Sequence, residues 1–253
     1  MLVVVARIKR PWVCWNWAVG TAVAALVSLG ASVAAGASVV DGASVGPVTV
    51  YEFTNVLANH TIEASFEQSA LTSPILDGAV SSGTAASGSS ITINHTTGTG
   101  ANRLMLAGIS WNCGSTGRTI SSVTFTPSGG SAVNLEPVIT QQAGTQLRYA
   151  AIYSLLNPPS GTAGTLTVTF SGSVGSGIVA GAANFMGVNQ TTPLGTPGGV
   201  GSTAQGTAPS VTLNGLGGSE LVFDTVFMGG TSSQTLTPGA DQTQLWNNFA
   251  GSA

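Results

Sequence analysis

The chain has 253 residues, of which 43% are hydrophobic and only 6% are charged, against about 25% charged in an ordinary soluble domain. Three of its six basic residues lie in the first ten positions, so the rest of the chain sets three arginines against nine acids. A surface that binds nucleic acid needs clustered Lys and Arg to displace counterions from phosphates. This composition therefore argues against nucleic acid as a partner and favours a β-rich protein whose exposed faces carry Ser, Thr and Asn.

The N-terminal segment, residues 1–37, has the order of parts found in a secretory signal peptide. Basic residues within the first ten positions precede an uncharged stretch that ends in small residues around Gly36. We expect an apolar leader helix here, acting as a signal peptide or, because the stretch is long enough to span a bilayer, as a membrane anchor. A third alternative is a chain start that reflects gene assembly. With a leader, the protein is secreted or on the cell surface, and it contacts a membrane only through an uncleaved N-terminal segment.

The two cysteines, Cys14 and Cys113, fall on either side of this predicted boundary. Removal of the leader would leave one thiol. The sequence therefore predicts neither an internal disulfide nor a metal site built on cysteine.

Residues 38–68 form the next predicted segment. The stretch VYEFTNVLANHTIEASF (50–66) consists of two short alternating runs around a polar turn. This pattern is typical of a β-hairpin.

Residues 69–253 have almost no helical periodicity and consist of strand-like runs bounded by Gly, Pro, Ser and Asn. The main runs are 89–95, 102–111, 121–127, 146–156, 165–170, 177–188 and 220–228. Run 165–170 (TLTVTF) places its apolar side chains on one face and three threonines on the other, whereas run 102–111 is apolar on both faces. The pattern predicts an all-β fold, an antiparallel β-sandwich or jelly-roll-like module. The Gly-rich segment 192–210 is predicted to be a long surface loop within it.

Two stretches resemble modules of large secreted bacterial surface proteins. VDGASVGPVTVYEFTNVLANHTIEASF (40–66) resembles the closing part of the divergent internalin-type bacterial repeat. The resemblance implies that the hairpin is a partial repeat.

A second resemblance covers residues 76–253. Its most distinctive phrases are YSLLNPPSGTAGTLTVTFSG (153–172) and NFMGVNQTTPLG (184–195), which are similar to a β-sandwich module of the same class of surface proteins. Members of that group usually continue past the segment that QTQLWNNF (242–249) resembles. The resemblance implies a sandwich that is incomplete at its C-terminal end.

Aromatic side chains are the candidates for ligand binding, since flat rings stack on sugars. The candidate residues are Trp111, Asn112, Trp246 and Asn247. For each ring the alternative is packing in the core or at its rim, and Tyr149 and Tyr153 are expected in the core because they alternate with leucines.

Carboxylates are the candidates for metal binding. Strict alternation in ELVFDTVFM (220–228) puts Asp224 on the same face as valines, where a charge needs a partner. The alternatives are an ion pair with Arg103 or Arg148, or a Ca²⁺ site shared with Asp77 or Asp241, since Ca²⁺ is bound by several oxygens. No other cofactor is predicted.

The histidines, His60 and His95, each stand in an Asn-His-Thr tripeptide and are predicted to be exposed at strand edges. Neither zinc-site spacing nor a nucleophile elbow accompanies them, so no catalytic residue is predicted. We expect a non-enzymatic structural or adhesive module of a secreted or cell-surface bacterial protein, with a carbohydrate-binding module as the alternative. The expected partners are extracellular glycans or other surface modules.

Overall fold

The computed structural model describes residues 2–7, 35–40, 43–46, 62–66, 73–143, 145–201, 211–214, 216, 220–228, 238 and 242–250. Within these ranges the chain forms strands and no helix, and the strand pairs are antiparallel, which confirms the predicted all-β class. The chain divides into two compact units, Pro11–Thr72 and a larger one of Met1–Arg10 with Ser73–Ala253.

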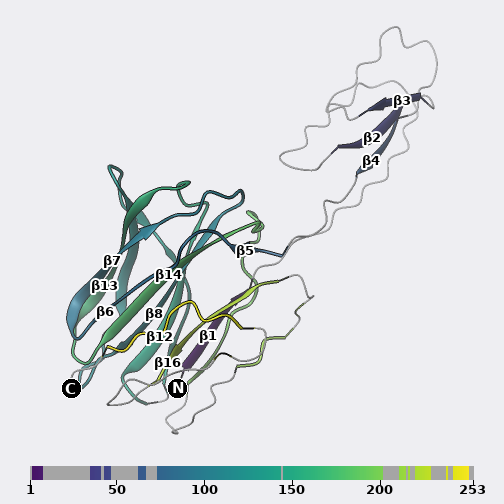
Figure 1. Ribbon diagram of the computed structural model, residues 1–253. Coiled ribbons are helices and arrows are strands. Elements are labelled where there is room, and N and C mark those ends of the chain that lie inside the picture. Colours follow the sequence, from purple (N-terminus) through teal and green to yellow (C-terminus); the bar gives the residue numbers. More distant parts are fainter. Residues whose placement is uncertain are drawn as a thin grey trace. The chain divides into compact units, whose positions relative to one another are not determined.

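The smaller unit contains a three-stranded sheet in the order β3-β2-β4 (Figure 1). Its strands are β2 (Ala35–Val40), β3 (Ala43–Gly46) and β4 (Ile62–Phe66). Strand β4 falls in the second run of the predicted hairpin, and residues 50–61 lie outside the described residues. Strand β2 was not predicted, and it begins inside the predicted leader.

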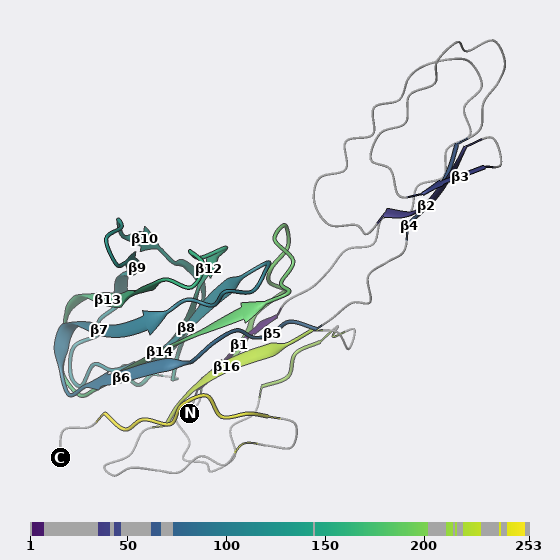
Figure 2. The same cartoon turned by 45° about the horizontal axis from the view of Figure 1, so that its top comes forward.

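The described residues of the larger unit form three sheets, which Figure 2 shows stacked on one another. The outer sheet has the order β10-β9-β13-β7, with β7 (Gly88–Thr96), β9 (Ile120–Pro127), β10 (Val133–Asn134) and β13 (Ala163–Val174). The middle sheet has the order β11-β12-β8-β14, with β11 (Glu136–Gln142), β12 (Arg148–Leu156), β8 (Leu104–Asn112) and β14 (Ile178–Met186). Strands β5 (Ile75–Leu76) and β6 (Ser81–Ala85) both pair with the free edge of β14. The third sheet is β15-β1-β16, with β15 (Gly198–Gly201), β1 (Leu2–Arg7) and β16 (Val222–Phe227).

Strand β8 explains the two-faced apolar run of the sequence, because it lies inside the middle sheet with a core on each side. Met105 and Ile109 are buried in the core shared with the outer sheet. Leu104 and Leu106 are buried in the second core, which includes Phe223 of the third sheet. Each fully buried side chain of this size stabilises the fold by about 1.5–3 kcal/mol.

Strand β13 has the predicted two-faced pattern. Leu166, Val168 and Phe170 are buried in the first core. The threonines between them are half-buried on the opposite face of the outer sheet. The strands of the outer sheet could therefore be predicted from alternation, because one face of this sheet packs on the core and the other does not.

The N-terminus differs from the predicted helix at its first residues. Leu2–Arg7 form β1, which pairs with β15 on one side and β16 on the other. Three consecutive valines favour an extended conformation at this point. Residues 8–34, which hold most of the predicted leader, lie outside the described residues. Among the residues that are described, no helix is long and apolar enough to cross a membrane.

The third sheet corrects two further predictions. Segment 192–210 was predicted to be a loop, but it contains strand β15. In β16 the buried residues are Phe223 and Thr225, whereas Val222 and Asp224 are exposed. The alternation of this strand was recognised, but its buried face was assigned to the wrong set of residues.

Candidate functional site

Trp111 is a core residue. Its side chain is 1% exposed, and its Nε1 donates to the carbonyl oxygen of Arg118 at 2.9 Å. The ring stacks on Tyr149 with 5.0 Å between centroids and lies 5.5 Å from Phe170. Tyr149 and Tyr153 belong to the same core, as predicted. A ring enclosed in this way offers no face to a ligand from solvent, so the prediction for Trp111 is corrected.

Trp246 lies against the opposite face of the middle sheet. Its ring lies over Gly181, where an added Cβ would come within 2.5 Å of Cε2, and it also reaches Gly108. Phe223 packs beside it, with 6.0 Å between ring centroids. Trp111 and Trp246 therefore belong to the first and second cores, and the middle sheet separates them.

The two neighbouring asparagines do not join the tryptophans into one site. Asn112 lies at the end of β8, where its Oδ1 accepts from the backbone N–H of Gly114 at 3.1 Å and supports a turn. Asn247 is exposed on the C-terminal segment.

Asp77 is a structural carboxylate. It is 8% exposed, and its two oxygens accept from the backbone N–H groups of Thr99 at 3.3 Å and Gly100 at 2.9 Å. Its own backbone N–H donates to the carbonyl oxygen of Asn184 at 2.8 Å. These bonds hold the segment before β6 against the loop that follows β7.

The other carboxylates do not gather around Asp77. Asp224 is exposed on β16, and Asp241 lies outside the described residues. Arg103, a predicted partner of Asp224, instead donates to the carbonyl oxygens of Pro158 and Gly100. In the part of the chain that the structure describes, no group of three or more His, Cys, Asp or Glu residues could hold a metal ion.

His95 is buried, and the prediction of an exposed strand-edge histidine was wrong. Its side chain is 3% exposed and faces the first core, following Ile91 and Ile93 along β7. Its Nδ1 lies 3.0 Å from Oγ of Ser81, and its Nε2 lies 2.9 Å from Nδ2 of Asn184. The alternation of the sequence ITINH was the signal that could have revealed this placement.

The Ser81, His95 and Asn184 side chains fix which ring nitrogen carries the proton. Nδ2 of Asn184 also donates to the carbonyl oxygen of Thr96 at 3.1 Å, and the reversed amide would place two oxygens against each other. Because an NH₂ group cannot accept, Nε2 of His95 accepts and the proton lies on Nδ1. Nδ1–H therefore donates to Ser81.

This tautomer decides what the cluster can do chemically. A serine nucleophile needs an unprotonated ring nitrogen facing its hydroxyl, and here the facing nitrogen holds the proton. Burial lowers the pKa of His95, which favours the neutral ring. Asn184 is 1% exposed, and its Oδ1 has no hydrogen-bond partner. The cluster links β6, β7 and β14 as a structural polar network.

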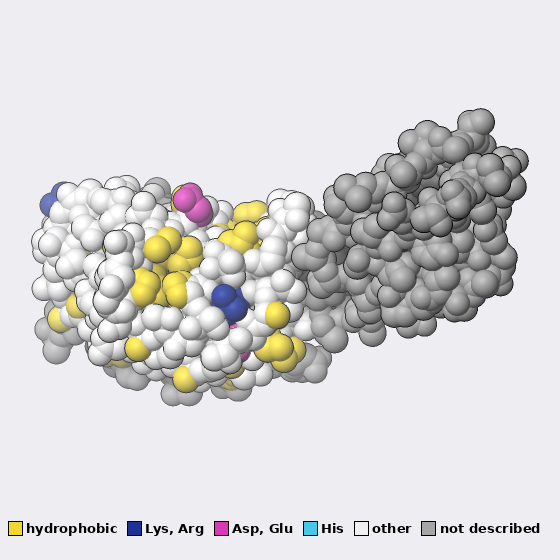
Figure 3. Space-filling view, turned by 90° about the horizontal axis from the view of Figure 1, so that it is seen from above, with side chains coloured by type: hydrophobic (Ala, Val, Ile, Leu, Met, Phe, Trp, Pro, Cys, Tyr) yellow, Lys and Arg dark blue, Asp and Glu magenta, His cyan; other side chains and the backbone are white. Residues whose placement is uncertain are grey.

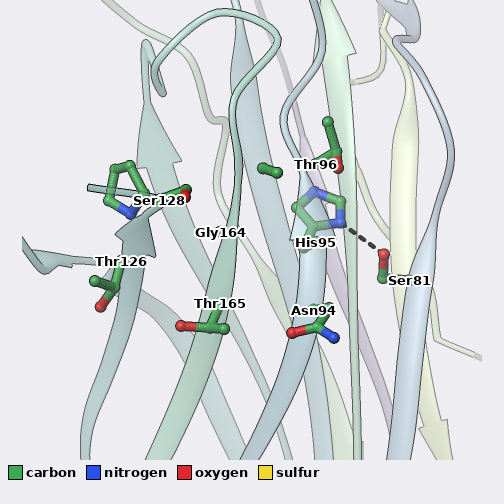
Figure 4. Close-up of a pocket in the computed structure, with 10 residues that line it drawn as sticks. Ser81, Asn94, His95, Thr96, Thr126, Ser128, Gly164 and Thr165 are labelled. Carbon is green, nitrogen blue, oxygen red and sulfur yellow. Dashed lines mark hydrogen bonds between the residues drawn. The ribbon is translucent and has the colours of Figure 1, made fainter. Parts of the chain in front are cut away.

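An open depression of about 600 Å³ lies beside this network (Figure 4). Its lining residues come from the ends of four strands and the adjoining turns: Ser81, Asn94, His95, Thr96, Thr126, Pro127, Ser128, Ala163, Gly164 and Thr165. Figure 4 shows the ring of His95 turned toward Ser81. None of the ten lining residues is an acid, a lysine or an arginine, so the depression offers neutral hydrogen-bonding groups only.

The solvent face of the outer sheet carries a regular array of small polar side chains. Three residues on each of three neighbouring strands form what we call the hydroxyl face: Ser90, Thr92 and Asn94 on β7, Thr165, Thr167 and Thr169 on β13, and Ser122, Thr124 and Thr126 on β9. The pairing places them in three rows across the strands. One row, Asn94, Thr165 and Thr126, is visible in Figure 4.

The hydroxyl face contains no charged, aromatic or long aliphatic side chain. Charged groups are also sparse on the side of the molecule that Figure 3 shows, where most of the described surface is neither charged nor hydrophobic. Outward threonines could be predicted on a single strand, but their alignment across strands could not, because β7, β9 and β13 are far apart along the chain.

Comparison with known proteins adds no assignment. No family model, no curated protein and no solved structure matches the chain.

Proposed function

We propose that the chain is a non-enzymatic structural or adhesive module of a secreted or cell-surface bacterial protein, and that the hydroxyl face is its contact surface. The observation that carries the proposal is the array itself: nine short polar side chains in register on one solvent face. Such a face meets water or a polar partner without exposing an apolar patch that would cause aggregation.

The buried polar network supports the non-enzymatic part of the proposal. Its serine faces a protonated ring nitrogen, and the depression beside it carries no carboxylate. A hydrolase needs a nucleophile with a free base or a pair of carboxylates.

The resemblance of residues 40–66 and 76–253 to modules of bacterial surface proteins supports the proposed location. We propose a sandwich of the jelly-roll-like kind for the larger unit, on the basis of its face-to-face antiparallel sheets. The alternative of a carbohydrate-binding module has lost support, because Trp111, one of its two candidate rings, lies in the core.

Two assays on the full chain test the proposal. Protease added to intact bacteria that express the chain should remove it, as expected for a surface protein. The purified chain should hydrolyse no ester, glycoside or peptide faster than its Ser81→Ala variant. Hydrolysis that Ser81→Ala abolishes would overturn the non-enzymatic assignment.

A further inference from the structure

Strand β1 lies between two strands that come from distant parts of the chain. It pairs with β15 through residues 2–5 and with β16 through residues 2–7, and both pairings are antiparallel. Strands β15 and β16 therefore run parallel to each other, with the width of one strand between them. We call the space between these two walls the strand slot. Strand β1 fills it, and Figure 1 shows β1 beside β16.

The walls of the strand slot are held on the middle sheet by contacts that do not involve β1. Strand β16 packs on β8, since Phe223 is 3% exposed in the second core and Thr225 lies against Gly108. Strand β15 packs on β11, where a Cβ on Gly199 would come within 3.3 Å of Cδ1 of Ile139. Strands β11 and β8 are the two neighbours of β12 in the middle sheet. The walls are thus held about two strand spacings apart, or about 10 Å, which is the width that one strand needs.

The connection of β1 to the rest of its unit is long. The compact unit Pro11–Thr72 lies between β1 and the part of the larger unit that begins at Ser73, and β15 and β16 follow much later in the sequence. A strand that is joined to its neighbour by a tight turn cannot be replaced without breaking that turn. Strand β1 has no such connection to either wall, so another extended segment can take its place while the walls stay anchored.

Backbone pairing and alternation define what the strand slot accepts. Because both edges of the occupying strand are paired, each of its N–H groups at residues 2–5 has an acceptor on one wall or the other. A proline would remove one of these donors. The register places residues 2, 4 and 6 on the face that carries the buried Phe223 and Thr225. An occupant therefore needs an extended backbone with apolar residues at alternate positions.

The opposite face of the slot adds a preference for charge. The register pairs Val5 with Asp224 and Arg7 with Val222. Paired residues share a face of the sheet, and a residue two positions further along lies diagonally across from the first. Arg7 is thus placed diagonally across from Asp224, which is exposed on β16. A basic residue at the last position of an occupant complements this carboxylate.

We propose that the strand slot is a strand-acceptor site that β1 fills within this chain and that, once the predicted leader is cleaved, binds an extended segment of a neighbouring surface protein. The segment has apolar residues at alternate positions and ends in a basic residue. It becomes the central strand of the third sheet, so that backbone hydrogen bonds on both sides join the two proteins. The inference rests on the proposed surface location and adds a second contact to that of the hydroxyl face.

Exchange of β1 in the full chain tests the proposal. A recognition site for a sequence-specific protease is inserted between Arg10 and Pro11, so that cleavage frees β1 from its connection while every residue stays present. A fluorescent peptide of residues 1–10 is added, and its anisotropy is recorded with the cut and the uncut chain. The uncut chain is the control, because its tethered β1 competes at a far higher effective concentration.

We expect the cut chain to take up the labelled peptide while its near-UV circular dichroism spectrum stays unchanged, and the uncut chain to take up none. The Val4→Pro peptide should not bind. The Arg7→Glu peptide should bind about threefold more weakly than the wild-type peptide, as expected when a favourable cross-strand charge pair becomes a repulsive one. The variant Asp224→Lys should reverse that preference, and Asp224→Asn, which should abolish it, keeps the test decisive if Asp224→Lys fails to fold.

Three results would overturn the inference: no uptake by the cut chain, uptake only as the chain unfolds, or equal uptake of the Val4→Pro peptide. Equal binding of the Arg7→Glu peptide would overturn the assignment of a basic end to the partner. These outcomes are distinct from failure of the proposed function, which would appear as Ser81-dependent hydrolysis or as resistance of the chain to protease added to intact bacteria.

Discussion

Gly181 of β14 lies directly opposite Gly108 of β8, and the indole of Trp246 lies against both. Because glycine has no side chain, this pair leaves a flat area on a sheet face that side chains otherwise cover. The C-terminal segment uses that area to cover the second core. Asn248 continues the contact, since its Nδ2 donates to Oγ of Ser82 at 2.9 Å.

A methyl group at this position should destabilise the protein. The Cβ of Gly181→Ala would lie 2.5 Å from Cε2 of Trp246, so the indole must move. We expect the free energy of unfolding, measured in urea, to fall by about 1–3 kcal/mol. Gly117→Ala is the control, because its Cβ would make an ordinary 3.5 Å contact with Leu147. Additive losses in Gly181→Ala combined with Trp246→Ala would contradict direct contact between the two residues.

The buried histidine should make stability depend on pH. Burial lowers the pKa of His95 below its ordinary value of 6.5. The bond from Asn184 acts in the same direction, because Nε2 can accept it only while it is unprotonated. In the unfolded chain the ring binds a proton near the ordinary value, so the unfolded state takes up more protons as the pH falls below it. Stability contributed by the neutral ring is therefore complete above that value and is lost as the pH decreases toward the lower, folded-state pKa.

Urea unfolding at pH 7.5 and at pH 5.5 measures this effect. His95→Gln should show a smaller loss of stability between the two values than the wild type. His60→Gln, which changes the same tripeptide in the other unit, should behave as the wild type. Equal losses in the wild type and His95→Gln would show that the ring is not buried in its neutral form.

Asp77 should contribute to stability without calcium. Asp77→Ala would leave the backbone N–H groups of Thr99 and Gly100 without their acceptor, at a cost of about 1–3 kcal/mol for a buried donor. Asp77→Asn keeps one acceptor oxygen, so its stability should lie between that of the wild type and that of Asp77→Ala. We expect the Tm of the wild type to be the same in excess Ca²⁺ and in EDTA. A rise in Tm with Ca²⁺ that Asp77→Ala removes would restore the calcium site.

Strand β1 leads to a prediction about processing. It is the central strand of the third sheet, so cleavage after the predicted leader would separate β15 from β16. Edges opened in this way promote pairing between chains. We expect a chain without residues 1–10 to self-associate in analytical ultracentrifugation, whereas the full chain does not. Equal behaviour of the two chains would show that β1 does not hold this sheet together.

The sequence predicted the features that depend on alternation within one strand. The outward threonines of 165–170 and the two-faced run 102–111 both correspond to observed strands. Successive side chains of a strand point to opposite faces, so the sequence of one strand shows whether one face or both faces are apolar. It was harder to predict which of the two faces of a strand packs on the core. Alternation identified two faces in 220–228 but not which of them packs on the core, so Asp224 was assigned to the wrong one.

Features that depend on pairing between distant strands could not be predicted. The site where Trp246 packs exists only because Gly108 and Gly181 are paired across two strands. The rows of the hydroxyl face likewise require three separate strands to be in register. The partners of His95 come from β6, which directly precedes β7 but was not predicted to be a strand, and from β14, where Asn184 is 89 residues away along the chain. Its placement inside the core, in contrast, could have been deduced from its alternation with Ile91 and Ile93.

Adhesion under flow tests the central claim that the module acts through its hydroxyl face. Beads would carry the full chain, Thr167→Lys at the centre of the hydroxyl face, or Thr140→Lys at an exposed position of β11 outside it. They would be settled on a layer of intact bacteria that express the chain, and the shear stress that detaches half of them would be recorded. The account predicts equal, high detachment stress for the wild type and Thr140→Lys, and detachment of Thr167→Lys at the stress that removes uncoated beads. Equal adhesion of all three proteins would contradict it, because the contact would then lie elsewhere on the molecule.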